Sequence, residues 1–324
     1  MGLLLIQYFA LAFLVVFSSI RISECVDELD KRTKLGGALI GGILLAGVTS
    51  LPELITSLSS TMMLNNPDLA LGNILGSNAF NVFILAVGNI IFFKHMMFNH
   101  TKTGNAKTNF INVIIYILIL ITFYSVTIAR VGHVGVTSIC IFVLYYINLK
   151  IATNNDEEEH EVRQDQPNDG SFSWLIFRFI CWACVIVGTS MLVSITTDRI
   201  AQATGIGSSF VGAIFLGVAT SLPETTSLIS LIRLRNYDMA IGNIVGSNLF
   251  NFGVIALTDF LYFSGNIFEI ADVSNTLLVT VGLCEAMILL YILLKKRMTN
   301  VFIYSLPSFG ILAIYSYYLY VSLK

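Results

Sequence analysis

Long runs of apolar residues, separated by short polar or charged segments, dominate the chain. Most runs reach about 20 residues, the length that an α-helix needs to cross the hydrocarbon core of a bilayer. The first run lacks the basic segment of a signal peptide, so it is predicted to be a span rather than a leader. Ten spans are predicted, at residues 3–23, 36–62, 69–93, 108–129, 131–149, 173–197, 207–232, 239–262, 274–294 and 300–322.

One stretch of the chain occurs twice. The motif TSLPE is found at 49–53 and again at 220–224, and a twelve-residue block follows each copy. The blocks are ALGNILGSNAFN at 70–81 and AIGNIVGSNLFN at 240–251, and nine of their twelve residues are identical. A repeat of this length in a very apolar chain indicates an internally duplicated membrane protein rather than a soluble repeat array.

The repeat and the spans together predict an all-α integral membrane protein with ten transmembrane helices. Residues 1–150 would form a first five-helix half and residues 173–324 a second, joined by an acidic linker at 151–172. Because each half has an odd number of spans, the second half is expected to be inverted relative to the first.

The basic residues predict the orientation of the chain. Fourteen of the eighteen Lys and Arg residues fall in or beside the loops after spans 1, 3, 5, 7 and 9. Positively charged loops stay on the cytoplasmic side of a membrane. We therefore expect a multi-pass protein of the cell membrane, with both termini outside and the 151–172 linker in the cytoplasm.

The composition excludes several classes of function. Hydrophobic residues make up 56% of the chain and charged residues only 12%, with no clustered basic face, so nucleic acid is not an expected partner. Cys181 and Cys184 form a CxxC pattern, but they lie in an apolar run where packing or lipid contact is the simpler interpretation. The four His residues are scattered, and no cofactor is predicted.

Each copy of the repeat places one carboxylate inside an apolar run. Glu53 and Glu224 lie in segments that otherwise carry no charge over many residues. An ionised side chain at that depth needs a counter-charge, water or a protein-lined cavity. A structural acid paired with a basic residue is the alternative, but no Lys or Arg lies at similar depth in either copy.

The residues near each acid supply further oxygen atoms. Pro52 and Pro223 should break or kink the helix just before the glutamate. Helical spacing would bring Thr49 and Ser50 to Glu53, and Thr220 and Ser221 to Glu224. The following block repeats Asn, Ser and Asn at every fourth position, at Asn73, Ser77, Asn81, Asn243, Ser247 and Asn251. A set made only of oxygen ligands suits hard cations such as Ca2+ or Na+.

Glycines recur in the same block at a spacing of four. Gly72 and Gly76 in the first copy correspond to Gly242 and Gly246 in the second. Small residues at this spacing allow two membrane helices to approach closely. We therefore expect this helix to pack tightly against the broken helix.

The two blocks resemble the alpha repeats of the sodium/calcium exchanger family, within the cation/calcium antiporter superfamily, over 36–90 and 207–258. The resemblance implies a cation site midway across the membrane, formed by the two acids with hydroxyl, amide and backbone oxygens. The implied residues are Ala46, Thr49, Ser50, Glu53, Ser77, Asn81, Gly217, Thr220, Ser221, Glu224, Ser247 and Asn251. Many sodium/calcium exchangers have Asp where this chain has Asn251, so the expected site has two acids rather than three.

The resemblance implies a secondary antiporter that exchanges Ca2+ for Na+, and not an enzyme. A proton remains the alternative counter-ion, because the TSLPE motif is similar to the sodium-coupled branch while proton-coupled exchangers also manage with two acids. A channel usually obtains its selectivity oxygens from rings of subunits. An intramembrane enzyme would have no use for a duplicated ligand set. Glu285, deep in the ninth span, has no recurring partner and is left outside the site.

Overall fold

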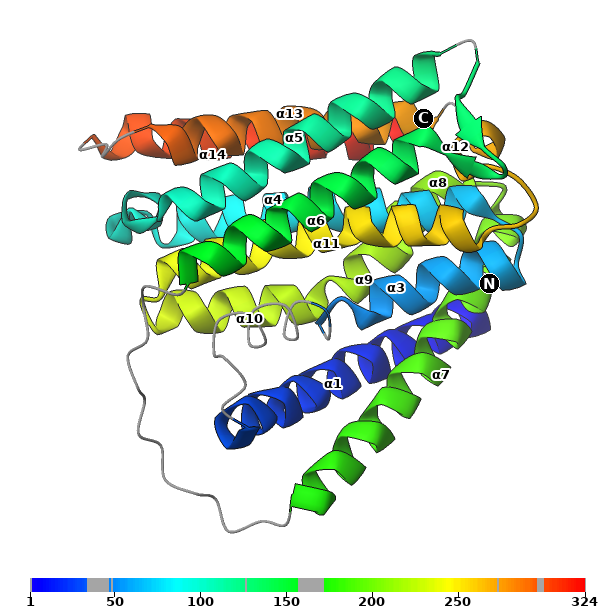
Figure 1. The fold of residues 1–324 in the computed structure, drawn as a ribbon, viewed down its shortest axis with the longest axis horizontal. Helices are drawn as coiled ribbons and strands as arrows, with labels where there is room; N and C mark the ends of the chain where they lie inside the picture. The colour runs from blue at the N-terminus through cyan, green and yellow to red at the C-terminus, as the bar shows by residue number, and fades with distance from the viewer. Residues whose placement is uncertain are drawn as a thin grey trace.

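The structure is a computed structural model that describes residues 2–33, 47, 49–125, 127–156, 172–272, 274–295 and 300–323. Helices form most of it and run largely along the long axis of the molecule (Figure 1). The α-helices are α1 (Gly2–Thr33), α3 (Leu51–Leu58), α4 (Pro67–Ile91), α5 (Thr103–Tyr124), α6 (Val136–Asp156), α7 (Phe172–Thr204), α8 (Ser208–Val211), α9 (Val218–Thr220), α10 (Leu222–Arg233), α11 (Tyr237–Leu261), α12 (Ile267–Ile270), α13 (Asn275–Leu294) and α14 (Val301–Ser322).

Shorter elements connect or interrupt these helices. Two π-helical segments, η1 (Ser59–Met63) and η4 (Gly212–Gly217), follow α3 and α8. Two 3-10 turns, η2 (Phe93–His95) and η3 (Met97–His100), lie between α4 and α5. A small antiparallel hairpin pairs β1 (Arg130–Val131) with β2 (Val134–Gly135).

The helices account for most of the predicted spans. Among the described residues, seven helices are long and apolar enough to cross a bilayer, namely α1, α4, α5, α7, α11, α13 and α14. A further candidate is the pair Ser208–Thr220 and Leu222–Arg233, which is bent by 45° at the break between its two parts. The predicted span at 36–62 lies partly outside the described residues, and the other nine predictions each overlap a helix.

The predicted fifth span begins too early in the sequence. We expected it to start at residue 131, but the hairpin occupies this position and α6 begins at Val136. Gly132 has φ +66°, a conformation that lets the chain reverse between the two strands. Asp259 of α11 then accepts hydrogen bonds from the Gly135 N–H at 2.8 Å and the Ser138 hydroxyl at 2.6 Å. This distant acid fixes the hairpin, so local apolar pattern alone could not reveal it.

Contacts between helices repeat across the two copies of the sequence. Helix α4 packs against α13 and α14, and its counterpart α11 packs against α5 and α6. Helices at equivalent positions in the two copies also contact each other, namely α1 with α7, α5 with α13, and α4 with α11. Helices α4 and α11 each contain 25 residues. The duplication in the sequence therefore corresponds to a matching arrangement of packed helices.

An aspartate lies in the first turn of each of the two central helices, α4 and α11. Asn66 and Asn236 cap α4 and α11, and each is followed two residues later by an aspartate. Asp68 accepts a 2.7 Å bond from the Asn275 amide of α13, and Asp238 accepts a 3.0 Å bond from the Asn105 amide of α5. Each aspartate thus attaches the start of its own helix to a helix of the other copy.

Burial separates the central helices from the outer ones. The most apolar stretch of each helix was compared by the share of it that is buried. This share is 61% for α4 and 67% for α11, but 28% for α1 and 33% for α7. Figure 1 shows α1 and α7 together along one side of the bundle. Large apolar side chains such as Phe9 and Phe13 of α1 are exposed, as expected for a surface that faces lipid. The two repeated blocks, residues 70–81 and 240–251, consequently lie in the protein interior.

Candidate cation site

The two repeat glutamates lie buried at the starts of two helices. Glu53 is the third residue of α3 and Glu224 the third residue of α10, and both are 0% exposed. Pro52 and Pro223 occupy the second position of these helices, where the missing N–H is tolerated. In the second copy the predicted break before the acid is confirmed by the 45° bend, and in the first copy a new helix begins at 51.

Each carboxylate accepts a hydrogen bond from a serine of the opposite copy. The Ser50 hydroxyl donates to Glu224 Oε1 at 3.0 Å, and the Ser221 hydroxyl donates to Glu53 Oε1 at 3.4 Å. All four side chains are 0% exposed. The two helix starts therefore meet in the centre of the protein, with each acid held by the other half of the sequence.

The threonines, like the serines, form hydrogen bonds with the acid of the opposite copy. Thr220 makes a hydrogen bond with Glu53, and Thr49 makes one with Glu224. The spacing predicted that each Thr–Ser pair would meet the acid of its own copy, and this prediction was wrong. The pairs lie at the break, where Ser221 has ψ 2° rather than a helical value, so their hydroxyls point across to the facing helix start.

Four asparagines cross-link α4 and α11 beside the acids. Asn78 and Asn248 each donate to the backbone carbonyl of the other, at 3.2 and 3.1 Å. Asn81 donates to the Asn248 side-chain oxygen and Asn251 to the Asn78 side-chain oxygen, both at 2.9 Å. Because their N–H groups are used in this way, Asn81 and Asn251 keep their carbonyl oxygens free.

Asn78 and Asn248 were missed by the sequence reasoning. They are identical in both copies, as the last residue of each GSN triplet, and this identity was the available signal. The four-residue spacing drew attention to Ser77 and Asn81 instead, which lie on an adjacent line of the helix. Only the contact between α4 and α11 gives the two missed asparagines their role.

Five buried oxygens of the predicted ligands have no hydrogen-bond partner. They are Glu53 Oε2, Glu224 Oε2, Asn81 Oδ1, Asn251 Oδ1 and Ser247 Oγ. Leaving a buried polar oxygen unpaired costs about 1–3 kcal/mol, and more when it is charged. Oxygens of these types are the ligands that hard cations prefer, and two carboxylates match the charge of one divalent ion. The residues present therefore have the oxygen types and the charge that suit a divalent hard cation.

The remaining predicted ligands lie close to this group or outside the described chain. The Ser77 hydroxyl donates to the Gly217 carbonyl at 3.1 Å and lies 3.4 Å from the Thr220 hydroxyl. Ala46 is not among the described residues. Within those residues, no group of three or more His, Cys, Asp or Glu side chains could hold a metal ion. The site therefore depends on neutral oxygens as well as its two acids.

Both the amide nitrogen and the side-chain oxygen of Asn73 are hydrogen-bonded to other residues of the protein. Its amide donates to the hydroxyls of Thr56 and Ser57, both at 2.8 Å, and to the Glu53 backbone carbonyl at 3.3 Å. The Asn73 side-chain oxygen accepts a 3.3 Å bond from Thr220. This side chain holds α3 in place beside the acid.

Close packing around the site depends on the glycines of α4. A Cβ atom at Gly72 would collide with the Ser209 backbone, and one at Gly76 would collide with Ala213. In the first copy the expected approach to a broken helix is therefore seen, and the partner is the broken helix of the second copy. Gly217 belongs to the same close contact, because a Cβ there would lie 2.8 Å from the Ser77 backbone nitrogen. In the second copy Gly242 lies against Asn105 of α5, and no described atom lies within 4 Å of a Cβ built at Gly246.

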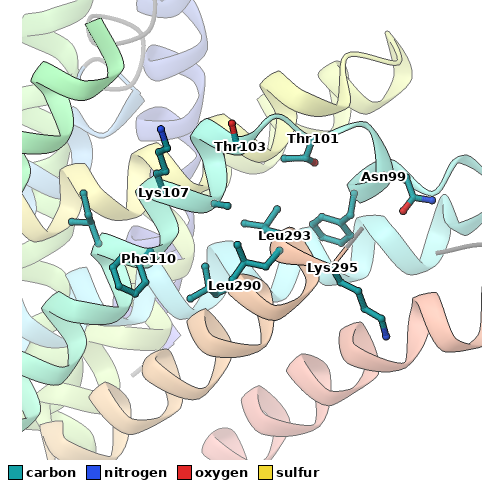
Figure 2. Close-up of a pocket in the computed structure, with 12 residues that line it drawn as sticks. Asn99, Thr101, Thr103, Lys107, Phe110, Leu290, Leu293 and Lys295 are labelled. Carbon is teal, nitrogen blue, oxygen red and sulfur yellow. The ribbon is translucent and has the colours of Figure 1, made fainter. Parts of the chain in front are cut away.

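A separate pocket of about 900 Å³ lies near the end of the bundle, between the start of α5 and the end of α13. Figure 2 shows Phe110, Leu290 and Leu293 between these helices, with Lys107 and Lys295 on different sides of the pocket. Its lining contains two basic residues and no acid. It is therefore distinct from the cation site described above.

Comparison with known proteins finds relatives by sequence and solved structures with a similar fold. The inner membrane protein YrbG of Escherichia coli is 27% identical over 286 residues, which cover 83% of each chain. Among solved structures, the sodium-calcium exchanger NCX_Mj has a TM-score of 0.63 at 19% identity, covering 98% of this chain and 99% of that one. The H+/Ca2+ exchanger CAX has a TM-score of 0.72 at 14% identity, covering 99% and 88%.

A family match also covers most of the chain. The family described as sodium/calcium exchanger protein matches residues 3–152 and 174–324. These two segments contain both copies of the repeat, every described residue of the candidate site and almost all of the helices. The chain therefore belongs to the sodium/calcium exchanger family of membrane ion transporters.

Proposed function

We propose that this protein is a secondary antiporter that exchanges Ca2+ for Na+ across the cell membrane. The observation that carries the proposal is the set of five unpaired, buried oxygens on Glu53, Glu224 and three of the other predicted ligands. Such a group is costly unless a cation completes it. The likeness to NCX_Mj, a sodium-calcium exchanger, supports the choice of ions.

The chemistry of exchange follows from competition for the same oxygens. One Ca2+ neutralises the two carboxylates, and Na+ ions that occupy the site instead do the same with single charges. Each acid accepts hydroxyl bonds from the opposite copy, so a bound ion touches both halves of the protein at once. Alternating access then requires the halves to rock about this site while it is filled.

The proposed architecture consists of two inverted five-span halves, residues 1–150 and 173–324, joined by the 151–172 linker. The matching contacts of α4 and α11 support an internal symmetry of this kind. The first residues of α1 and the last of α14 lie toward the same end of the bundle (Figure 1), as an even number of spans requires. The distribution of basic residues supports both termini outside.

The orientation can be tested by labelling single cysteines. In a background cleared of the five native cysteines, cysteines placed near Asn155 and near Asn66 should react from opposite faces of intact cells. An impermeant thiol reagent added outside is expected to label the site near Asn66 and to spare the one near Asn155. Labelling of both sites from outside would exclude the inverted ten-span arrangement.

Ca2+ flux into proteoliposomes tests the proposed exchange directly. Uptake should depend on an outward Na+ gradient and should fall when this gradient is removed. Uptake driven only by an outward proton gradient would assign the protein to Ca2+/H+ exchange. Uptake that proceeds without any counter-ion gradient would indicate a channel instead.

Exchange of Ca2+ for protons is the second candidate, and one feature of the site favours it. The residue at 251 is Asn, so the site holds two acids rather than the three expected in many sodium-coupled relatives. Two carboxylates can carry two protons and become neutral without any further ligand. The likeness to CAX, an H+/Ca2+ exchanger, is compatible with this alternative.

The number of acids also predicts the charge carried in each cycle. Two carboxylates balance one Ca2+, two Na+ or two protons, whereas a third Na+ would leave a net positive charge in the interior. We expect wild-type exchange to be electroneutral. Asn251→Asp should change the counter-ion dependence more than the Ca2+ affinity, and Asn81→Asp is the matched variant in the first copy.

This expectation is checked by measuring the reversal condition for Ca2+ flux in vesicles clamped at different membrane potentials. The wild-type reversal point should not move with voltage. A reversal point that shifts as required for three Na+ per Ca2+ would show that counting carboxylates is the wrong basis for the stoichiometry.

A further inference from the structure

A third buried acid lies outside the cation site. Glu285 of α13 is 0% exposed, and neither of its carboxyl oxygens has a hydrogen-bond partner. Asp259, which is also 0% exposed, is different, because its oxygens accept bonds from Gly135, Ser138 and Ile267. Asp259 is therefore explained by the hairpin that it holds, whereas Glu285 stabilises no neighbouring element through a hydrogen bond.

No cation faces Glu285 from the helices described around it. Helix α13 packs against α4, α5 and α14. Tyr116 of α5 and Tyr315 of α14 lie close enough to interact with the Glu285 carboxyl electrostatically. Asp68 is the titratable residue of α4 and lies in its first turn, while Lys107 of α5 lines the pocket of Figure 2 and forms no ion pair with Glu285.

A hydrogen-bonded path connects this region with the cation site. Asn78 makes a hydrogen bond with the Tyr116 hydroxyl, next to Glu285. The Asn78 side-chain oxygen accepts the 2.9 Å bond from Asn251 described above. Asn251 then presents one of the unpaired oxygens to the cation. Two side chains, Tyr116 and Asn78, thus separate Glu285 from a ligand of the proposed ion.

We propose that Glu285 is a proton-binding site that is coupled to the central cation site through Tyr116 and Asn78. An ionised carboxylate without a counter-charge is costly in the interior of a membrane protein, so the carboxyl holds a proton while the cation site is empty. A proton needs only one oxygen, whereas Na+ would need several ligands that the surroundings of Glu285 do not supply. The inference rests on the proposed function, because it assigns a proton dependence to the same exchange.

The pocket of Figure 2 offers a route for the proton. It is lined by Ile111 of α5 and Leu290 of α13, and Leu290 is five residues beyond Glu285 along the helix. Five residues of α-helix correspond to roughly 8 Å along the axis. Asn112, on the α5 segment between the pocket and Tyr116, is buried and its side-chain oxygen is unpaired, and the buried Asn109 lies next to the pocket residue Phe110. These amides provide polar groups along the route.

The sign of the coupling follows from charge. When Ca2+ enters the central site, its positive charge favours the ionised form of Glu285, so the proton leaves as the ion binds. The carboxylate that remains attracts Ca2+ in turn. Acidic pH, which keeps the proton on Glu285, is therefore expected to weaken Ca2+ binding, and glutamine at this position should imitate the protonated form at every pH.

The test is the number of protons released when Ca2+ binds to the purified protein, obtained by calorimetric titration in buffers of different ionisation enthalpy. Glu285→Gln should release fewer protons than wild type, by up to about one per Ca2+. Its Ca2+ affinity near neutral pH should be roughly fivefold weaker or more. Cys284→Ser changes the neighbouring exposed residue and should match wild type in both quantities.

Infrared spectroscopy provides a second measurement that does not depend on transport. Wild type should show the carbonyl band of a protonated carboxyl in the absence of Ca2+, and Glu285→Gln should lose part of this band. Equal proton release by wild type and variant, or an unchanged infrared band, would overturn the assignment of Glu285. Failure of Ca2+ to bind to wild type at all would instead refute the proposed function, while the infrared band would still report on Glu285.

Discussion

Replacing Glu53 with glutamine is expected to abolish Ca2+ exchange while the protein still folds and inserts into the membrane. Glutamine keeps the size of the side chain and can still accept the Ser221 hydroxyl bond, but it removes half of the site's negative charge. Removing one partner of a buried charge pair typically costs about 2–5 kcal/mol. Since about 1.4 kcal/mol corresponds to a factor of ten, transport should fall by roughly thirtyfold or more. Glu224→Gln should have the same effect.

Uptake of radioactive Ca2+ into proteoliposomes measures this loss, with the amount of inserted protein determined in parallel. Glu269→Gln is the matched control, because Glu269 is a half-exposed acid paired with Arg130 at the surface. The control should transport like wild type. Near-normal Ca2+ flux in Glu53→Gln would show that the paired acids are not the transport site.

Valine at Gly76 is expected to disrupt the packing of the two copies. A Cβ atom at this position would collide with both Cα and Cβ of Ala213 in the broken helix of the second copy, and backbone atoms cannot move aside as a flexible side chain could. Overpacking of a filled interior typically costs about 1–3 kcal/mol, and here the clash lies beside the acids. We expect a large loss of folded protein and of exchange together.

The melting temperature of detergent-solubilised protein, followed by size-exclusion chromatography, measures this effect. Gly188→Val on α7 is the matched control, because no atom lies within 4 Å of a Cβ built there. The control should melt like wild type. Equal melting temperatures for Gly76→Val and Gly188→Val would mean that α4 and η4 do not pack as closely as the structure indicates.

The local chemistry of the sequence was sufficient to place the central elements. Proline removes a backbone donor wherever it occurs, so the break before Glu224 could be predicted from Pro223 alone. The glycine spacing likewise predicted a close helix contact, and Gly76 lies in one. These features depend on residues within a few positions of each other, and the sequence displays them directly.

The pairing of groups across the site depended on how the two copies meet. Nothing in the spacing indicates that Ser50 bonds Glu224 rather than Glu53, because this contact joins residues 174 positions apart. The role of Asn78 has the same origin, since its partner Asn248 lies on a helix 170 positions away. Contacts of this range follow from the packing of complete helices and have no signature in either segment alone.

Equilibrium binding of Ca2+ to the purified protein tests most directly whether the unpaired oxygens form the ion site. Wild type should bind Ca2+ at a single saturable site, and Na+ should compete with it. The double variant Glu53→Gln with Glu224→Gln, which keeps the shape of the site and removes both charges, should bind no Ca2+ in the same range while melting like a folded protein. Wild-type Ca2+ binding by a folded double variant would contradict the proposed site.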